Sequence, residues 1–464
     1  MLTAYFTSRG EFHTDTGIYH AQAIRIIEEY GVIKGLANLQ LHFGYNSAYF
    51  SFCALFTGSS ILPSALHSTT GFIEALCLVY SIRNIKRYWK SSKSVVGASA
   101  SIILYALINI TGSMSPATDY VSLFMVLFVI SEWCIAASQT REIVDKTSEV
   151  DRFIMPALMS VFVVSMKLST GPMIILALYP LIILARAKKW RKMIWSVIMS
   201  ITAVIPYLIR NVIISGWLLY PFEKIDLFNV EWKVPVEQLR KDAAQIEVWG
   251  KTLCDVAKQD MPALQWIPIW WSNQEHYDQM LIYAVVLSDL LVTGIMIAHI
   301  IRREKINASA VVLYLAMYAV LIMWFVESPF VRYGLEVLIA LPLITIGKLI
   351  DYRKGMQNPG FTEYFGGTIA ALIFLCFAAT LDHYATTDIV TAKHDLSEPY
   401  YLMQQPFADS ETKYVEMNGN KIYYSVDGEN NSYYNCPSSC YEVMMNNCEL
   451  MGDTIKSGFR SRSR

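Results

Sequence analysis

The sequence predicts an all-α polytopic membrane protein with about ten to eleven transmembrane helices. Hydrophobic residues make up 54% of its 464 residues and charged residues only 17%, whereas soluble domains usually carry about 25% charged residues. The mean hydropathy is +0.34. The apolar residues also gather in blocks of roughly 17–23 residues, the length that crosses a bilayer as a helix. These observations favour a membrane-embedded bundle over a soluble domain.

The charge balance and the missing motifs exclude several classes of function. With 39 acidic and 38 basic residues, the net charge is −1, which excludes a nucleic-acid-binding protein held by bulk positive charge. The high hydrophobicity excludes a disordered chain. The sequence contains no GxxxxGK[ST] loop, no GxGxxG turn after a strand and no HExxH helix, so nucleotide hydrolysis and zinc-protease chemistry are not expected. The energy for any transfer reaction must therefore arrive in the substrate.

Ten apolar blocks are predicted to cross the membrane. They cover residues 64–84, 95–112, 119–138, 153–166, 169–185, 192–214, 279–301, 307–326, 331–350 and 363–384. The short blocks 153–166 and 169–185 predict a broken or tightly turned pair, because irregular backbone at membrane depth needs protein or a cavity to satisfy it. A further apolar stretch, 46–62, is predicted to be re-entrant or interfacial. The alternative is a true span at 46–62, which would place the next basic loop outside.

Positive charge predicts the orientation. Four basic loops, at 83–93, 186–192, 302–305 and 348–354, are expected in the cytoplasm by the positive-inside rule. The loop 139–151 would also lie inside although it is slightly acidic, which speaks against the helix count.

This orientation divides the chain into three regions. The first is an outer loop with an interfacial helix, 1–45, and the second is a transmembrane bundle, 46–384, with a large outer loop at 215–278. The third is an extracytoplasmic C-terminal tail, 385–464. Because residue 1 already begins in an outer loop, a first transmembrane helix is expected to be missing from this chain.

The N-terminal loop carries a candidate catalytic acid. An apolar stripe at 23, 26, 27 and 30 predicts a helix that lies flat in the membrane interface. Asp15 stands at its start, where Asp15 or Thr16 would cap the helix. Asp15 is also a candidate general base at the membrane surface, and the two roles are not exclusive. His13, His20 and Glu28 would surround such a base.

The segment 35–47 is rich in amides and flanked by aromatic residues. Asn38, His42 and Asn46 suit the hydroxyl groups of a sugar or glycan acceptor. The alternative is an ordinary interfacial belt, because aromatic residues gather at the surface of any membrane protein.

Three cations are predicted at a similar depth on the outer side. Lys167, Arg210 and Arg332 lie at or near the outer ends of predicted spans, and together they would suit an anionic phosphate group. The alternatives are snorkelling of each side chain to the interface and an ion pair between Arg332 and Glu327.

Three cysteines cluster in the C-terminal tail. Cys436 and Cys440 form a CxxxC pair that could close a disulfide in an oxidising compartment. The alternative is that these two and Cys448 are free thiols. A metal site is less favoured, because no histidine lies nearby.

The chain resembles the GT-C superfamily of integral membrane glycosyltransferases, and most closely an uncharacterised bacterial group of multi-pass proteins involved in surface polysaccharides. The resemblance rests on residues 15–22, 35–39, 44–47, 166–169, 215–221, 226–233 and 455–460. It implies a GT-C-like bundle in which Asp15 acts as the base on the acceptor or holds a metal. It also implies that Arg210 and Arg332 hold the phosphate of a polyprenyl-phosphate sugar donor.

The expected activity is transfer of a sugar from that donor to a glycan or lipid-linked acceptor, on the periplasmic face of the bacterial inner membrane. No cofactor is assigned, although a divalent metal is a candidate. The partners would be the lipid-linked donor, the acceptor and membrane lipids. Two alternatives are a glycan polymerase and a transporter or flippase of lipid-linked sugars. The lack of internal repeats argues against transport.

Overall fold

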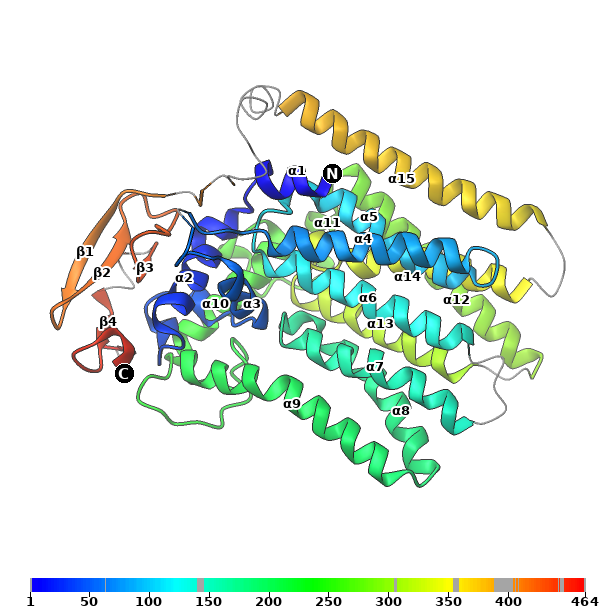
Figure 1. Ribbon diagram of the computed structural model, residues 1–464, viewed down its shortest axis with the longest axis horizontal. Helices are drawn as coiled ribbons and strands as arrows, with labels where there is room; N and C mark the ends of the chain where they lie inside the picture. Colours follow the sequence, from blue (N-terminus) through cyan, green and yellow to red (C-terminus); the bar gives the residue numbers. More distant parts are fainter. Residues whose placement is uncertain are drawn as a thin grey trace.

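The protein is a helical bundle with a small β-containing module at one end (Figure 1). Its computed structural model describes residues 2–62, 64–139, 146–303, 307–353, 359–387, 404, 406–407, 409–440, 442 and 446–462. Parts of the predicted loops and tail, at 140–145, 304–306, 354–358 and 388–403, lie outside the described residues.

Fifteen α-helices are present in the described residues. They are α1 (Leu2–Arg9), α2 (Ala21–Tyr30), α3 (Ala48–Phe56), α4 (Thr69–Tyr88), α5 (Lys93–Asn109), α6 (Thr118–Gln139), α7 (Lys146–Val164), α8 (Ile175–Arg186), α9 (Trp190–Ser215), α10 (Val236–Thr252), α11 (Ala263–Ser272), α12 (His276–Ile301), α13 (Ala308–Glu327), α14 (Leu335–Arg353) and α15 (Pro359–Thr387). A π-helical turn, η1 (Thr16–His20), precedes α2. The 3₁₀ turns are η2 (Leu36–Asn38), η3 (Leu41–Gly44), η4 (Ile110–Gly112), η6 (Leu168–Ile174), η7 (Val256–Lys258), η8 (Val331–Tyr333) and η10 (Ile455–Ser457).

Seven helical segments in the described part of the chain are long and apolar enough to cross a membrane. They are α5 with η4, α6, η6 with α8, α9, α12, α13 and residues 363–382 of α15. The remaining three predicted blocks coincide with α4, α7 and α14, each of which also carries several ionisable residues. The membrane character is therefore supported, whereas the count of ten to eleven spans is not confirmed.

The stretch 46–62 does not form a full span. Its only helix, α3, has nine residues, and at about 1.5 Å per residue this is far shorter than a bilayer core of about 30 Å. The pair of short spans is broken as predicted, since α7 ends at Val164 and the turn η6 precedes α8.

Helix α5 lies at the centre of the bundle, packed against α4, α6 and α14. Its first turns are built from small residues, and a Cβ atom added at Gly97 would lie 2.5 Å from the Leu343 carbonyl oxygen on α14. Small residues allow this close approach of two helix backbones. The Asp351 carboxylate on α14 accepts the backbone N–H groups of Lys93 and Ser94 at 2.7 and 3.0 Å, and so caps α5.

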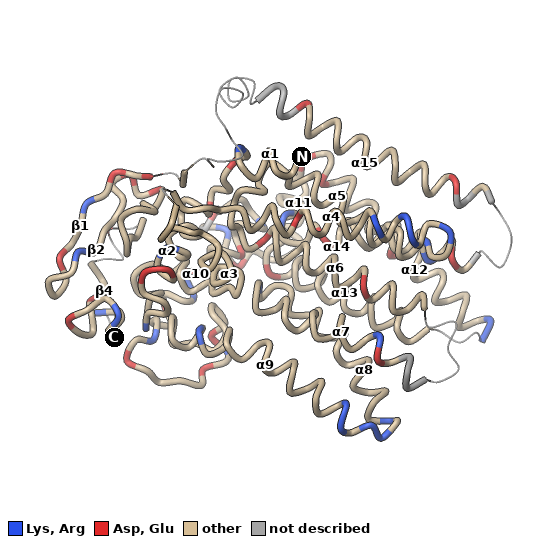
Figure 2. The backbone as a smooth tube through the Cα atoms, in the orientation of Figure 1, with Lys and Arg blue, Asp and Glu red and all other residues tan. Residues whose placement is uncertain are grey.

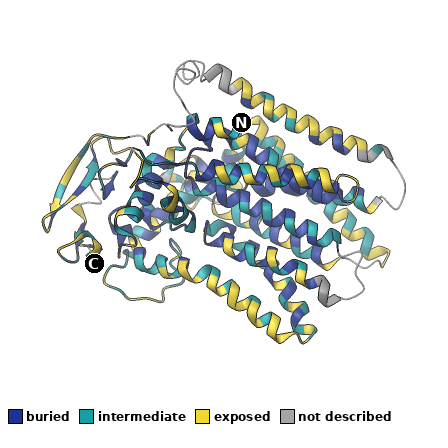
Figure 3. Ribbon diagram, viewed as in Figure 1, coloured by how far each residue is buried: buried dark blue, intermediate teal, exposed yellow. Residues whose placement is uncertain are grey.

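The two ends of the bundle differ in charge. Figure 2 shows lysine and arginine residues gathered where α4 ends, at the α8–α9 turn and at the end of α12. The N-terminal segment, α10 and the β-containing module lie at the opposite end (Figure 1). We call the first the basic end and the second the site end. At the periphery, only 17% of the apolar window of α9 is buried, against 78% for α5 (Figure 3).

The C-terminal tail forms a folded module, residues 409–462, on the site end. Strands β1 (Thr412–Met417) and β2 (Asn420–Ser425) make an antiparallel hairpin, and β3 (Ser438–Ser439) runs parallel to β2. The hairpin turn, Asn418-Gly419, has positive φ at both residues, as two-residue hairpins favour. Strands β4 (Cys448–Leu450) and β5 (Phe459–Ser461) pair separately.

The predicted disulfide between Cys436 and Cys440 is not observed in the described part of the chain.

Helix α2 differs from the interfacial helix that the sequence predicts. Its polar face contacts the C-terminal module, because the Gln22 amide donates to the Ser432 and Asn435 carbonyl oxygens and the Tyr433 hydroxyl donates to Glu28. Its apolar face packs against α3. The sequence pattern correctly predicts a helix with two faces, but both faces are covered by protein.

Candidate functional site

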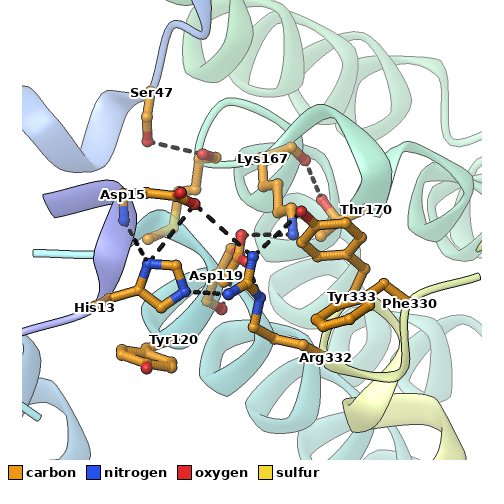
Figure 4. A network of polar contacts seen from close by, with 12 residues as sticks. His13, Asp15, Ser47, Asp119, Tyr120, Lys167, Thr170, Phe330, Arg332 and Tyr333 are labelled. Carbon is orange, nitrogen blue, oxygen red and sulfur yellow. Dashed lines mark hydrogen bonds and ion pairs between the residues drawn. The ribbon is translucent and has the colours of Figure 1, made fainter. Parts of the chain in front are cut away.

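Five ionisable side chains from four distant segments meet at the site end (Figure 4). His13 and Asp15 precede η1, Asp119 lies in the first turn of α6, Lys167 lies between α7 and η6, and Arg332 lies in η8. Three of the predicted site residues, Asp15, Lys167 and Arg332, are therefore brought together, and His13 lies among them.

Asp119 is the centre of this cluster, and sequence reasoning missed it. Its Oδ1 lies 2.6 Å from Lys167 Nζ, and its Oδ2 lies 3.3 Å from Arg332 Nε. The side chains of Asp119 and Lys167 are only 12% and 16% exposed. An acid in the first turn of a predicted span was a usable signal, because ionisable residues near membrane depth usually face a partner or a cavity.

Asp15 lies at the accessible edge of the cluster. Its Oδ2 is 3.6 Å from His13 Nδ1 and 3.8 Å from Arg332 Nη2, and its side chain is 33% exposed. The side chain makes no capping hydrogen bond to the following turn. The capping role considered for Asp15 is therefore not observed, and its carboxylate faces the cluster.

The surroundings keep His13 neutral and Arg332 charged. Burial lowers the pKa of His13, and the Arg332 guanidinium, which contacts His13 Nε2, lowers it further. Burial also lowers the pKa of Arg332, but the carboxylate of Asp119 and the neighbouring Tyr333 and Asp15 raise that pKa overall. The predicted ion pair between Arg332 and Glu327 is not observed, because the guanidinium lies against the carboxylates of Asp119 and Asp15.

Aromatic rings lie beside the two cationic side chains of the cluster, Lys167 and Arg332. The Lys167 ammonium lies 4.5 Å and the Arg332 guanidinium 5.0 Å from the centre of the Tyr333 ring. Phe330 lies 5.3 Å from the same guanidinium, and Tyr120 meets the His13 ring edge-on. Rings at this distance attract cations, so they fix the two positive groups without neutralising them.

Hydrogen bonds to the backbone place the segments that carry the cluster. The Ser115 hydroxyl accepts the His13 N–H at 2.6 Å, and the Ser47 hydroxyl donates to the Met166 carbonyl, next to Lys167, at 2.7 Å. From the C-terminal module, the Asn431 N–H and side-chain amide donate to the Gly17 and Ile18 carbonyl oxygens at 2.8 and 2.6 Å. The module therefore holds the turn that directly follows Asp15.

His20 and His42 form an aromatic layer behind the cluster. His20 is buried, its ring centre lies 6.1 Å from that of His13, and its Nδ1 lies 3.4 Å from Thr16 Oγ1. Tyr19 packs edge-on to His20 and stacks on His42. Burial, with a smaller contribution from His13, lowers the pKa of His20 well below its usual value.

Four other predicted site residues, Arg210, Glu28, Asn38 and Asn46, contact neither Asp15 nor Asp119. Arg210 on α9 donates to the Ser51 hydroxyl of α3 at 2.8 Å and to the Ser47 carbonyl oxygen at 3.5 Å, so it contacts the segment that precedes and begins α3 rather than the Asp119 carboxylate that joins Lys167 and Arg332. Glu28 pairs with Arg25 at 3.2 Å.

The side-chain amides of the two predicted asparagines, Asn38 and Asn46, bond to backbone carbonyl groups of other segments. The Asn38 side chain donates to the Trp232 carbonyl at 2.9 Å, and that of Asn46 donates to the Tyr207 carbonyl at 3.0 Å. Both amides are buried and tie neighbouring segments together.

The cluster does not fit a divalent metal. Within the described residues, no group of three or more His, Cys, Asp or Glu side chains is arranged to hold a metal ion. The two carboxylates, Asp15 and Asp119, both face Arg332, so a cation of the protein already occupies the space between them.

A family model described as a domain of unknown function, DUF8201, matches residues 1–339. The chain belongs to this family. All five residues of the cluster lie inside the matched range, whereas the C-terminal module lies outside it. Neither the curated proteins nor the solved structures include a match to the chain.

Proposed function

We propose that the protein is a membrane glycosyltransferase, which moves a sugar from a polyprenyl-phosphate-linked donor to a glycan or lipid-linked acceptor. One observation carries the proposal: Asp15, Lys167 and Arg332, which are 317 positions apart at the extremes, meet at one end of a helical bundle. A partly exposed carboxylate beside two fixed cations is the arrangement that transfer from a phosphate leaving group needs.

Asp15 is assigned the role of general base. The acceptor hydroxyl oxygen forms a bond to the anomeric carbon of the donor sugar, and the bond from that carbon to the phosphate oxygen breaks. The proton of the hydroxyl goes to the Asp15 carboxylate, which is the more exposed of the two carboxylates in the cluster. The electron pair of the broken bond leaves with the lipid phosphate.

Lys167 and Arg332 are assigned to that phosphate. Its charge rises as the bond breaks, so cations that are already in position stabilise the transition state more than the ground state. Asp119 holds both cations and is a positioning residue in this scheme. The Tyr333 ring, which lies beside both cations, supports the same geometry.

The orientation is part of the proposal. The basic turns lie at the end opposite to the cluster (Figure 2), and the positive-inside rule assigns such turns to the cytoplasm. The cluster and the C-terminal module would then face the periplasm from the inner membrane. A reporter fused after Lys90 or Lys189 should read cytoplasmic, and one fused after Glu247 or Tyr414 should read periplasmic. The reverse pattern would overturn this orientation.

The function itself is tested with lipids. Mass spectrometry of lipids that co-purify with the full chain should detect a polyprenyl-phosphate species, and the purified protein should release polyprenyl phosphate from a labelled donor. Binding of the donor without turnover would instead favour a transporter or flippase. Loss of long surface-polysaccharide chains with intact repeat units in a deletion strain would favour a polymerase.

A further inference from the structure

A cleft lies between α7 and α9, the two helices that run side by side toward the basic end in Figure 1. Its volume is about 600 Å³, within the range of roughly 300–1,000 Å³ that holds small molecules. It is lined by Asp151, Ile154 and Leu158 from α7 and by Arg191, Lys192, Trp195, Ser196 and Met199 from α9. These positions follow helical spacing, so each helix contributes one face.

Contacts between the two helices lie on either side of the cleft along the helix axes. Toward the site end, Ala157 and Val161 of α7 pack with Val204 of α9. Toward the basic end, Lys192 Nζ donates to the Asp151 carboxylate at 2.6 Å. Between these contacts the helices leave the cleft, and α9 lies at the periphery of the bundle, where only 17% of its apolar window is buried.

The mouth of the cleft has excess positive charge. Asp151 balances Lys192, which leaves Arg191 as the excess cation among the residues that line the cleft. Three more exposed bases, Arg186, Lys188 and Lys189, lie on the adjoining turn, and residues 186–192 contain no acid. A negatively charged group is therefore favoured at this mouth.

The interior of the cleft is apolar. Ile154, Leu158, Trp195 and Met199 line it, and such walls bind hydrocarbon but give nothing to a hydrated inorganic ion. The combination of a basic mouth, a tryptophan and apolar walls matches an amphiphile whose phosphate lies at the membrane surface.

We propose that this cleft binds an anionic phospholipid. The phosphate lies against Arg191 and Lys192, and one acyl chain follows the apolar walls between α7 and α9. The bound lipid fills the space between the two helices and so stabilises the position of α9 against the bundle. This site is independent of the proposed glycosyltransfer, because none of its residues belongs to the cluster at the site end.

The test compares lipids on the purified full chain by native mass spectrometry. Phosphatidylglycerol, phosphatidylethanolamine and inorganic phosphate are each added to protein in the same detergent. The wild type should retain phosphatidylglycerol over phosphatidylethanolamine, and a variant with Arg191→Gln and Lys192→Gln should retain roughly tenfold less of it. Ser196→Phe, which fills the cleft without changing charge, should also lose the lipid and provides a second, charge-neutral test.

The matched control removes two bases from the same end of the bundle but from α4. A variant with Arg83→Gln and Lys86→Gln, both exposed, should retain phosphatidylglycerol like the wild type. Equal loss in this control would show a general effect of surface charge and overturn the site. Equal retention of the two lipids, unchanged retention in Ser196→Phe, or displacement of the lipid by inorganic phosphate at equal concentration would overturn it as well.

Discussion

Two ion pairs of the same length lie at opposite ends of the bundle, and their surroundings differ. Asp119 and Lys167 at the site end and Asp151 and Lys192 at the basic end are both 2.6 Å apart. The first pair is largely buried and shares its carboxylate with Arg332, whereas the side chains of the second are 45% and 52% exposed. Distance alone therefore says little about the energy of an ion pair, because burial decides what remains when one partner is removed.

The largest predicted effect on stability follows from removal of the Asp119 carboxylate, which Lys167 and Arg332 share. Asp119→Ala leaves the buried Lys167 and Arg332 without their main partner and should lower the free energy of unfolding by about 3–5 kcal/mol. Asp151→Ala at the exposed pair is the matched control and should change it by less than about 1 kcal/mol. Thermal unfolding of both variants in one detergent measures the difference. Similar midpoints for the two variants would contradict the comparison.

A smaller effect is predicted where the C-terminal module meets the N-terminal segment. A Cβ atom at Gly35 would lie 1.9 Å from the Phe459 carbonyl oxygen of β5, and Gly35 also has a positive φ of 62°. Gly35→Ala therefore combines backbone strain with a clash against backbone that cannot rotate away.

Gly419→Ala is the matched control, because Gly419, in the turn between β1 and β2, also has a positive φ, of 75°, but no atom within 4 Å of the added Cβ. The strain common to both variants costs about 1–2 kcal/mol, and the clash should cost a further 1–3 kcal/mol or so in Gly35→Ala alone. Denaturation of the two variants side by side separates the terms. An equal loss of stability in the two variants would show that the close contact between Gly35 and β5 of the module has no energetic effect.

The smallest predicted effect is a loss of folding stability at acidic pH. Burial lowers the pKa of His20 and His13 in the folded protein below the usual value of 6.5, so the folded state excludes protons that the unfolded chain binds. Stability that is fully present above pH 6.5 is therefore lost as the pH falls through this value and toward the lowered pKa values. Each proton taken up on unfolding contributes at most about 1.4 kcal/mol per pH unit.

This pH dependence is measured as the drop in the thermal midpoint between pH 7.5 and pH 5.5. His20→Gln should reduce the drop, whereas His276→Gln, at an exposed position, should leave it unchanged. A drop of the same size in all three proteins would exclude His20 as a source of acid sensitivity.

Sequence reasoning worked where a pattern is local and failed where a contact depends on the fold. The ten apolar blocks each coincide with a helix, because a long apolar run is sufficient to predict one. The two helices of the loop 215–278, α10 and α11, were not predicted, because neither contains an apolar run long enough to cross a membrane. The folded C-terminal module was not predicted either, because its strands are only two to six residues long.

The candidate site shows the same division. Asp15, Lys167 and Arg332 could be selected from their positions at predicted membrane boundaries, and the structure brings them together. Arg210 satisfied the same rule but donates to Ser51 and to the Ser47 carbonyl oxygen, because the rule gives the depth of a residue and not its direction around a helix. Asp119, in the first turn of a predicted span, satisfied the same rule but was not selected. Its pairing with Lys167 and Arg332, 48 and 213 positions away, is not visible in any local pattern.

The central claim is that Asp15 is the base, and one measurement tests it most directly. Asp15→Asn removes the basic lone pair but keeps the shape of the side chain, and turnover of a labelled polyprenyl-phosphate sugar should fall by about 10²–10⁴-fold. Its thermal midpoint should stay close to that of the wild type, because Asp15 lies 3.8 Å from Arg332 and is partly exposed. Asp226→Asn, an exposed acid at the same end, is the control and should keep full turnover. Near-normal turnover in Asp15→Asn would contradict the claim and shift the search for the base to Asp119.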